Sequence, residues 1–261
     1  MDILSYLPQD HPWRGQIVHL SQVDSTNDYA KKLAEKGAPQ GTVVVADCQT
    51  GGRGRRGRTF HSPEKMGVYL SVILRPKAKA EEIMHLTCAV AVAMVDAVYN
   101  ASGIAPKIKW INDLLWGNRK LGGILTELSV KPNGDVDYAI VGIGINCLQR
   151  EFPEEIRDMA TSLTLAADRE IAPARLAGEM ILALCSMADT LLSEKESVMG
   201  RYEQNCVTLG KEIKIIQGEK IRYGTALKLD WDGALLVRLE DGREETVQSG
   251  EVSVRGLYGY L

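Results

Sequence analysis

The sequence lacks the cysteine and histidine patterns that indicate a disulfide framework or a zinc site. Its five cysteines are scattered and odd in number, and none belongs to a C-x-x-C pair. This usage favours reduced thiols in a cytoplasmic protein. The four histidines have no metal-ligand spacing such as H-E-x-x-H, which argues against zinc chemistry.

The sequence also has little that would direct it to a membrane or to nucleic acid. The N-terminus, Met-Asp-Ile-Leu, has no basic segment followed by an apolar core, so we expect no signal peptide. The longest apolar run, around residues 88–95, is short for a bilayer span and is followed by Asp96. The net charge is −3 and the pI is about 5.9, whereas general nucleic-acid binders are usually basic. We therefore expect neither membrane insertion nor DNA binding.

What the chain does have is the composition of an ordinary globular protein, with 261 residues, 45% hydrophobic and 25% charged. That length is enough for one large domain and one small one. Residues 150–205 read as helical, mainly at 173–193 and 199–205. From residue 207 the pattern changes to short alternating strands separated by Gly-rich turns, which indicates a small antiparallel barrel or sandwich. We predict domains of residues 1–206 and 207–261.

The most unusual stretch is Gly51-Gly52-Arg53-Gly54-Arg55-Arg56-Gly57-Arg58, in which four glycines are interspersed with four arginines. Repeated glycine disfavours both helix and strand, and adjacent positive charges repel one another when no counter-ion is present. Glycine lets backbone N–H groups approach an anion, and the guanidinium fork matches carboxylate or phosphate. We interpret the stretch as a mobile loop that binds an anion. A solvated basic loop or a nucleic-acid patch is the alternative.

Two polar segments precede this loop in the sequence. Ser25 and Thr26 precede a predicted helix, where capping alone explains these residue types. The same hydroxyls, with the free N–H groups of a helix start, would also form a polar recess for a ligand. Gln49 follows a predicted buried strand at 42–47, where it is either solvated or offers its amide to a ligand.

Paired glycines interrupt two predicted strands. Gly122 and Gly123 follow Lys120, which by default is a surface lysine, and glycine within a strand often marks the close approach of a ligand or another backbone. Gly142 and Gly144 share one face of a predicted strand at 138–146. Because neither has a side chain, they leave a flat surface against which a planar group could lie. The alternative explanation for the two glycines is a bulge or close helix packing.

Five motifs, in this order along the chain, closely resemble those of the bacterial biotin–protein ligases. They are Asp24-Ser25-Thr26-Asn27, Gly52-Arg53-Gly54-Arg55-Arg56-Gly57-Arg58, Lys109-Trp110-Ile111-Asn112-Asp113, Arg119-Lys120-Leu121-Gly122-Gly123-Ile124-Leu125 and Gly142-Ile143-Gly144-Ile145-Asn146. The resemblance runs from about residue 15 to the C-terminus. It implies an α+β fold, with a class II synthetase-like mixed β-sheet and helices followed by a small SH3-like β-barrel.

The resemblance also implies a two-step reaction. The carboxylate of biotin attacks the α-phosphate of ATP to give biotinyl-5′-adenylate and pyrophosphate, and a lysine of a biotin carboxyl carrier domain then displaces AMP. The carrier domain would belong to a biotin-dependent carboxylase. Two mutually repelling anions must meet, so the site needs fixed positive charge. Lys120 and Arg55 are the expected catalytic residues, and Mg²⁺ is expected on the phosphates, with no protein ligand assigned.

Carried over residue by residue, the resemblance divides the site between two substrates. On the biotin side it implies Ser25, Thr26, Asn27, Gln49, Gly52, Arg53, Gly54, Arg55, Lys120, Gly122 and Gly123. On the ATP side it implies Arg56, Arg58, Phe60, Asn112, Asn146 and, in the small domain, Arg255.

This sequence departs from the family pattern at three places. Ile111 stands where the family often has proline, and Phe60 stands where tryptophan is common. No helix-turn-helix segment precedes Gln16, so we expect a monofunctional ligase without DNA binding. The alternatives are a lipoate–protein ligase with similar chemistry and a non-catalytic nucleic-acid-binding module. Monomer and homodimer are both compatible with the sequence.

Overall fold

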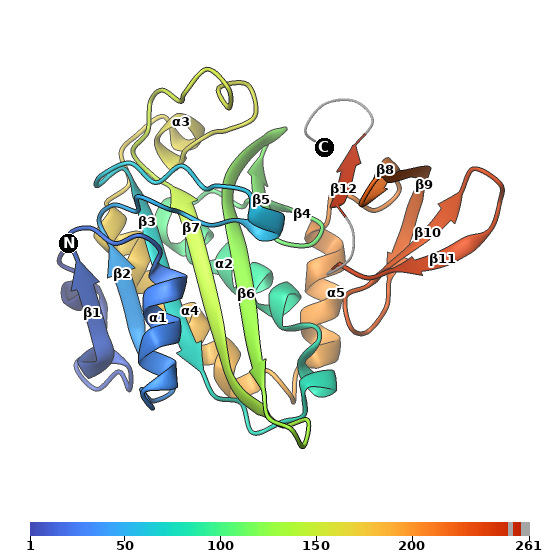
Figure 1. The fold of residues 1–261 in the computed structure, drawn as a ribbon. Helices are drawn as coiled ribbons and strands as arrows, with labels where there is room; N and C mark the ends of the chain where they lie inside the picture. The colour runs from blue at the N-terminus through green and yellow to red at the C-terminus, as the bar shows by residue number, and fades with distance from the viewer. Residues whose placement is uncertain (250–252, 257–261) are drawn as a thin grey trace.

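Two β-sheets organise the chain (Figure 1). The computed structural model describes residues 1–249 and the backbone of residues 253–256. The larger sheet has seven strands in the order β1-β2-β3-β7-β6-β5-β4. β1 and β2 run parallel, and the other neighbouring pairs are antiparallel. The strands are β1 Ile17–Leu20, β2 Val43–Ala46, β3 Gly67–Leu74, β4 Lys107–Lys109, β5 Asp113–Trp116, β6 Arg119–Val130 and β7 Val136–Asn146.

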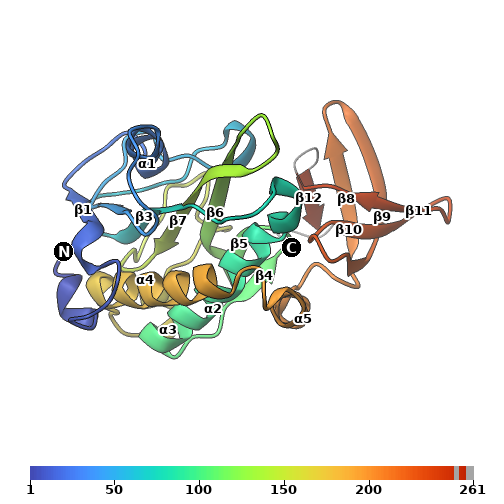
Figure 2. The ribbon, with the colours of Figure 1, turned by 90° about the horizontal axis from the view of Figure 1, so that it is seen from below.

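Helices cover both faces of this sheet. Figure 2 shows α1 (Thr26–Glu35) on one side and α2 (Leu86–Ser102) with α4 (Pro173–Thr190) on the other. Every residue of β3 is buried as a consequence, as expected for a strand sandwiched between two helical layers. On the α1 face, Ala30 and Ala34 pack on Ile73 and Ile140. The opposite face holds the larger core cluster, which includes most of α2.

The apolar stretch Ala80–Ser102 forms the centre of that larger core. By length and hydropathy alone it could cross a membrane, contrary to the expectation from its short unbroken run. In the fold, 72% of its most apolar 18-residue segment is buried inside the protein. A core helix buried on several sides is apolar around its whole circumference for the same reason that a membrane helix is.

The chain continues through α3 (Leu163–Ala167) and α5 (Lys195–Asn205) into a smaller antiparallel sheet, at the right of Figure 1. Its order is β11-β10-β9-β8-β12. The strands are β8 Glu212–Gln217, β9 Lys220–Leu229, β10 Leu235–Leu239, β11 Glu244–Val247 and β12 Ser253–Gly256. The α+β class with a small C-terminal β-unit is confirmed. The helical expectation was wrong for residues 150–162, 168–172 and 191–194, which form turns and irregular segments.

The proposed domain boundary at residues 206 and 207 falls between α5 and β8. Here the chain lies beside β4, because the Val207 N–H donates to the Ile108 carbonyl at 2.9 Å. Trp110, just after β4, donates its indole N–H to the Gly233 carbonyl at 2.8 Å. The smaller sheet is therefore joined to the segment that leads into Asn112 and Asp113.

Candidate active site

The N-terminus of α1 faces the middle of the large sheet through a buried polar network. Ser25 caps the helix by accepting a hydrogen bond from a first-turn N–H at 3.4 Å, so the capping interpretation is confirmed. Gln49 Oε1 accepts from the backbone N–H of Thr26 at 2.9 Å and from its hydroxyl at 3.1 Å. The Ser71 hydroxyl donates to Asn27 Oδ1 at 2.6 Å. Four residues expected to bind biotin are thus brought together, with Ser71 of β3 as an additional member.

Gly142 and Gly144 provide space for two side chains on this face. A Cβ at Gly142 would lie 1.9 Å from Asn27 Oδ1, so its absence allows close packing of α1. A Cβ at Gly144 would lie 2.5 Å from the Phe60 ring. A planar group was expected over these glycines, and over Gly144 it is the ring of Phe60, which follows the arginine loop in the chain.

Lys120 lies at the start of β6, near several polar groups that were expected in the site. Its Nζ is 2.5 Å from Asp113 Oδ1, and its side chain is 27% exposed. A Cβ at Gly123 would lie 3.1 Å from that Nζ, so this glycine gives the lysine room to move. Arg55 donates to Asn112 Oδ1 at 3.3 Å. A lysine, an arginine, a carboxylate and an amide therefore converge from a loop and two strands.

The arginine–glycine stretch is a hydrogen-bonded turn. The Gly54 N–H donates to the Arg58 carbonyl at 2.7 Å, and the Phe60 N–H donates to the Gly52 carbonyl at 2.9 Å. Arg56 and Gly57 both have positive φ, 57° and 72°, which turns the chain sharply. Gly52 is needed at its position, because a Cβ there would lie 2.4 Å from the Phe60 carbonyl oxygen.

Arg55 is the half-buried arginine of this turn, whereas Arg53, Arg56 and Arg58 are exposed. Burial lowers the pKa of Arg55; Asp113 opposes that shift, whereas Arg56 and Arg58 add to it. Its guanidinium also donates to the carbonyl of Ser249, which connects the loop to the smaller sheet. A lowered arginine pKa means that the charged form would gain from a nearby anion.

Arg53 has a different environment from Arg55. Its guanidinium donates to Asp28 and, at 2.9 Å, to Glu127 Oε1. Partial burial alone would lower the pKa of Arg53, but Glu127 and Asp28 raise it. Sequence reasoning missed both carboxylates. The available signal was strand alternation, which places Glu127 on the same face of β6 as Gly123.

Two expected site residues, Gly122 and Asn146, make their contacts outside this cluster. Gly122 points to the opposite face from Gly123, since a Cβ there would meet Ile145 and the Gly144 carbonyl. Asn146 is buried, with its amide N–H₂ donating to the Thr161 carbonyl at 2.9 Å. The side chain of Arg255 lies outside the described part of the chain. Arg56 and Arg58 are on the exposed side of the turn.

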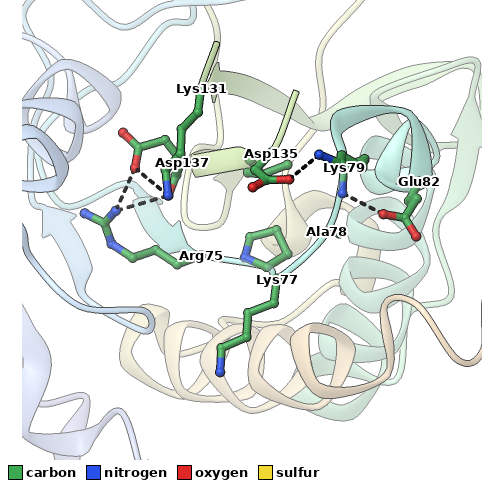
Figure 3. Close-up of a pocket in the computed structure, with 10 residues that line it drawn as sticks. Arg75, Lys77, Ala78, Lys79, Glu82, Lys131, Asp135 and Asp137 are labelled. Carbon is green, nitrogen blue, oxygen red and sulfur yellow. Dashed lines mark hydrogen bonds and ion pairs between the residues drawn. The ribbon is translucent and has the colours of Figure 1, made fainter. Parts of the chain in front are cut away.

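A shallow hollow beyond the far end of β3 is separate from this site (Figure 3). Its charged groups are largely used within the fold. Arg75 donates to the Ala34 and Ala38 carbonyls at the end of α1, at 2.7 and 2.9 Å. Lys79 pairs with Asp135 at 2.7 Å. We therefore interpret the hollow as a region whose charged side chains bind the end of α1 and each other.

Comparison with known proteins places this architecture in a class. The model of the biotin/lipoate A/B protein ligase family matches residues 20–146, and that of the biotin protein ligase C-terminal domain matches residues 208–255. The fold and the site thus define a ligase of the biotin/lipoate type.

Individual relatives narrow the class. The bifunctional ligase/repressor BirA of Bacillus subtilis is 37% identical over 229 residues, which cover 87% of this chain and 70% of BirA. The biotin–[acetyl-CoA-carboxylase] ligase of Mycobacterium tuberculosis is 30% identical over 250 residues, covering 92% and 89%. The structure of the Aquifex aeolicus biotin protein ligase in complex with biotin and ATP superposes with a TM-score of 0.78 at 33% identity, covering 92% of this chain and 99% of that one. The chain belongs to the biotin–protein ligase family.

Proposed function

We propose that this protein activates biotin with ATP and transfers it to a lysine of a biotin carboxyl carrier domain. The observation that carries the proposal is the convergence of Lys120 and Arg55 on Asn112 and Asp113. In the first step a carboxylate oxygen of biotin bonds to the α-phosphorus, and the bond to the bridging oxygen breaks as pyrophosphate leaves. Both cations would stabilise the charge that accumulates between the two acids.

The ion pair of Lys120 with Asp113 supports this role for the lysine. Without an anionic ligand, the ion pair with Asp113 holds the ammonium beside Gly123. When biotin and ATP bind, Nζ would exchange Asp113 for the carboxylate and the α-phosphate. The buried network of Thr26, Asn27 and Gln49 would meanwhile hold the polar ring of biotin, because it offers both amide and hydroxyl groups.

The second step consumes the adenylate. The neutral amine of the carrier lysine attacks the acyl carbon, AMP departs with the bridging oxygen, and the amide nitrogen loses a proton. We propose a biotin-dependent carboxylase as the source of the carrier domain. All five cysteines are free thiols, which fits our proposal that the reaction takes place in the cytoplasm.

Mg²⁺ would accompany the nucleotide. In the described part of the chain no group of three His, Cys, Asp or Glu side chains could hold a metal by itself. Mg²⁺ commonly uses phosphate oxygens, water and one or two carboxylates, and Asp113 is a carboxylate on the site face. When bound, the ion would neutralise phosphate charge, while Lys120 and Arg55 orient the reacting oxygens.

The test is ATP-dependent pyrophosphate release with biotin or lipoate as the acid. We expect release with biotin, and a loss of about 100-fold or more in Lys120→Gln, because a neutral amide cannot offset the developing charge. Lys77→Gln is the matched control, since Lys77 is exposed at the opposite end of β3. Release with lipoate alone, or a near-normal rate in Lys120→Gln, would contradict the proposal.

A further inference from the structure

Arg53 connects the loop to two elements that are distant in sequence. Its guanidinium bridges Asp28 in the first turn of α1 and Glu127 in β6. The Arg53 and Asp28 side chains are 42% and 45% exposed, and Glu127 is 33% exposed. Exposed ion pairs contribute little to global stability. The bridge is therefore better placed to set the position of the loop than to stabilise the fold.

Glu127 also orients Asn27, which belongs to the buried polar network at the start of α1. Its Oε2 accepts from Asn27 Nδ2 at 2.7 Å, and the Leu125 carbonyl accepts from the same nitrogen at 3.2 Å. Both acceptors fix the amide so that Oδ1 points toward Ser71 and Gly142. An Asn27 amide held this way offers an oxygen to an N–H donor of a ligand.

We propose that Asp28 and Glu127 are positioning residues for biotin, and that they hold Arg53 and Asn27 as one unit. Closure of residues 51–58 and recognition of the biotin ring then depend on each other, because one carboxylate serves both. This inference rests on the proposed function. It gives the guanidinium of Arg53 a part in closing the loop, in place of direct contact with the substrate carboxylate.

A double-mutant cycle on the full chain tests the bridge, with biotin affinity measured by titration calorimetry. Asp28→Asn should weaken biotin binding about fivefold when Arg53 is present, as expected for loss of one ion pair. The same change should have less than about a twofold effect in the Arg53→Gln background, since the partner is gone. In steady-state assays the KM for biotin should rise while the KM for ATP stays unchanged. Equal effects of Asp28→Asn in both backgrounds would overturn the proposal.

The role of Glu127 in orienting Asn27 needs a second pair of variants. Glu127→Gln keeps an oxygen that can accept from Asn27, whereas Glu127→Ala does not, so the alanine variant should bind biotin more weakly than the glutamine variant. Equal affinities would contradict the orienting role. Glu35→Gln is the control, because Glu35 lies on the last turn of α1, the helix that carries Asn27 and Asp28. This variant should bind biotin like the unmodified chain.

Limited trypsin digestion of the free chain supplies an independent readout. Cleavage after Arg53 should be faster in Asp28→Asn and Glu127→Gln than in the Glu35→Gln control, and unchanged rates would refute a loop-holding role. The proposed function fails separately, if the unmodified chain takes lipoate instead of biotin. In that case the same cycle, measured with lipoate, still tests the bridge.

Discussion

The space above Gly142 shows how a single missing side chain shapes the site. The amide of Asn27 occupies the volume that a Cβ would take, at 1.9 Å from its ideal position. Contact with the Ser71 hydroxyl and the Glu127 carboxylate then fixes the amide. The missing side chain at Gly142 therefore allows both the close packing of α1 and the fixed position of the Asn27 amide.

Gly142→Ala should consequently impair both biotin binding and folding. The added methyl group must displace Asn27, and overpacking of this kind costs about 1–3 kcal/mol of unfolding free energy. We expect biotin affinity to fall by about tenfold, as for the loss of one well-placed hydrogen bond to the ligand. Calorimetric titration and urea unfolding measure the two effects.

Gly200→Ala is the matched control for this variant. Gly200 lies in α5 with nothing within 4 Å of its ideal Cβ position, so alanine there should add roughly 0.5–1 kcal/mol of stability. An unperturbed biotin affinity in Gly142→Ala would show that the position of Asn27 does not matter to the ligand.

At the scale of elements, a buried histidine, His85, is the N-cap residue of α2. His85 Nε2 lies 2.9 Å from the Leu191 carbonyl, and Nδ1 has no hydrogen-bond partner. Burial lowers the pKa of His85; the hydrogen bond to Leu191 opposes the shift, Lys195 adds to it and Asp232 opposes it. The neutral ring is therefore the form that the junction of α2 and α4 accommodates.

This pKa shift predicts a loss of stability in acid. The pKa of an unfolded histidine is about 6.5, and the folded value is lower, so the unfolded chain binds the proton first as pH falls. The stability is complete above about pH 6.5 and is lost as pH falls from there through the folded pKa, with a slope of at most about 1.4 kcal/mol per pH unit. Urea unfolding between pH 7.5 and 5 measures it.

His85→Gln should remove this part of the pH dependence. The glutamine amide can still donate to the Leu191 carbonyl but does not titrate. The exposed His61→Gln should keep a profile parallel to that of the unmodified chain. Parallel profiles for all three proteins would rule out His85 as the source.

At the scale of the whole molecule, the small sheet is attached to the large sheet at Trp110, just before Asn112 and Asp113. Trp110 joins the two through its indole N–H, and its backbone N–H donates to Thr208 Oγ1 at 2.9 Å. Lys195 of α5 pairs with Asp232 at 2.6 Å. The turn that follows Trp110 leads through Asn112 to Asp113 at the start of β5, so attachment of the small sheet and the geometry around Lys120 are linked.

Trp110→Phe should weaken that attachment. Without the indole N–H the Gly233 carbonyl loses its donor in a buried position, which costs about 1–3 kcal/mol. We expect a lower midpoint in differential scanning calorimetry and slower pyrophosphate release. The control is Trp231→Phe, because Trp231 is 61% exposed in the turn between β9 and β10. Equal midpoints for the two variants would mean that the indole bond does not join the units.

Much of the architecture could be predicted from local patterns. The β-branched run before the arginine loop became β2, the Ser25 cap began α1, and Gly-rich turns marked the small sheet. Motif order alone led to the correct family. These features follow from residue type and spacing over a few neighbours, which act wherever the segment lies in the fold.

Other features were decided by the tertiary structure. Gly122 and Gly123 were both expected at the ligand, but alternation along β6 turns them to opposite faces. Packing of the loop and α1 beside β6 brings Glu127 to Arg53, 74 positions earlier in the chain. The sequence by itself determined which chemical groups the protein owns and which short segments carry them. Which carboxylate meets which guanidinium was decided only when α1, the loop and β6 came together, because ion pairs depend on distances between segments that no local pattern encodes.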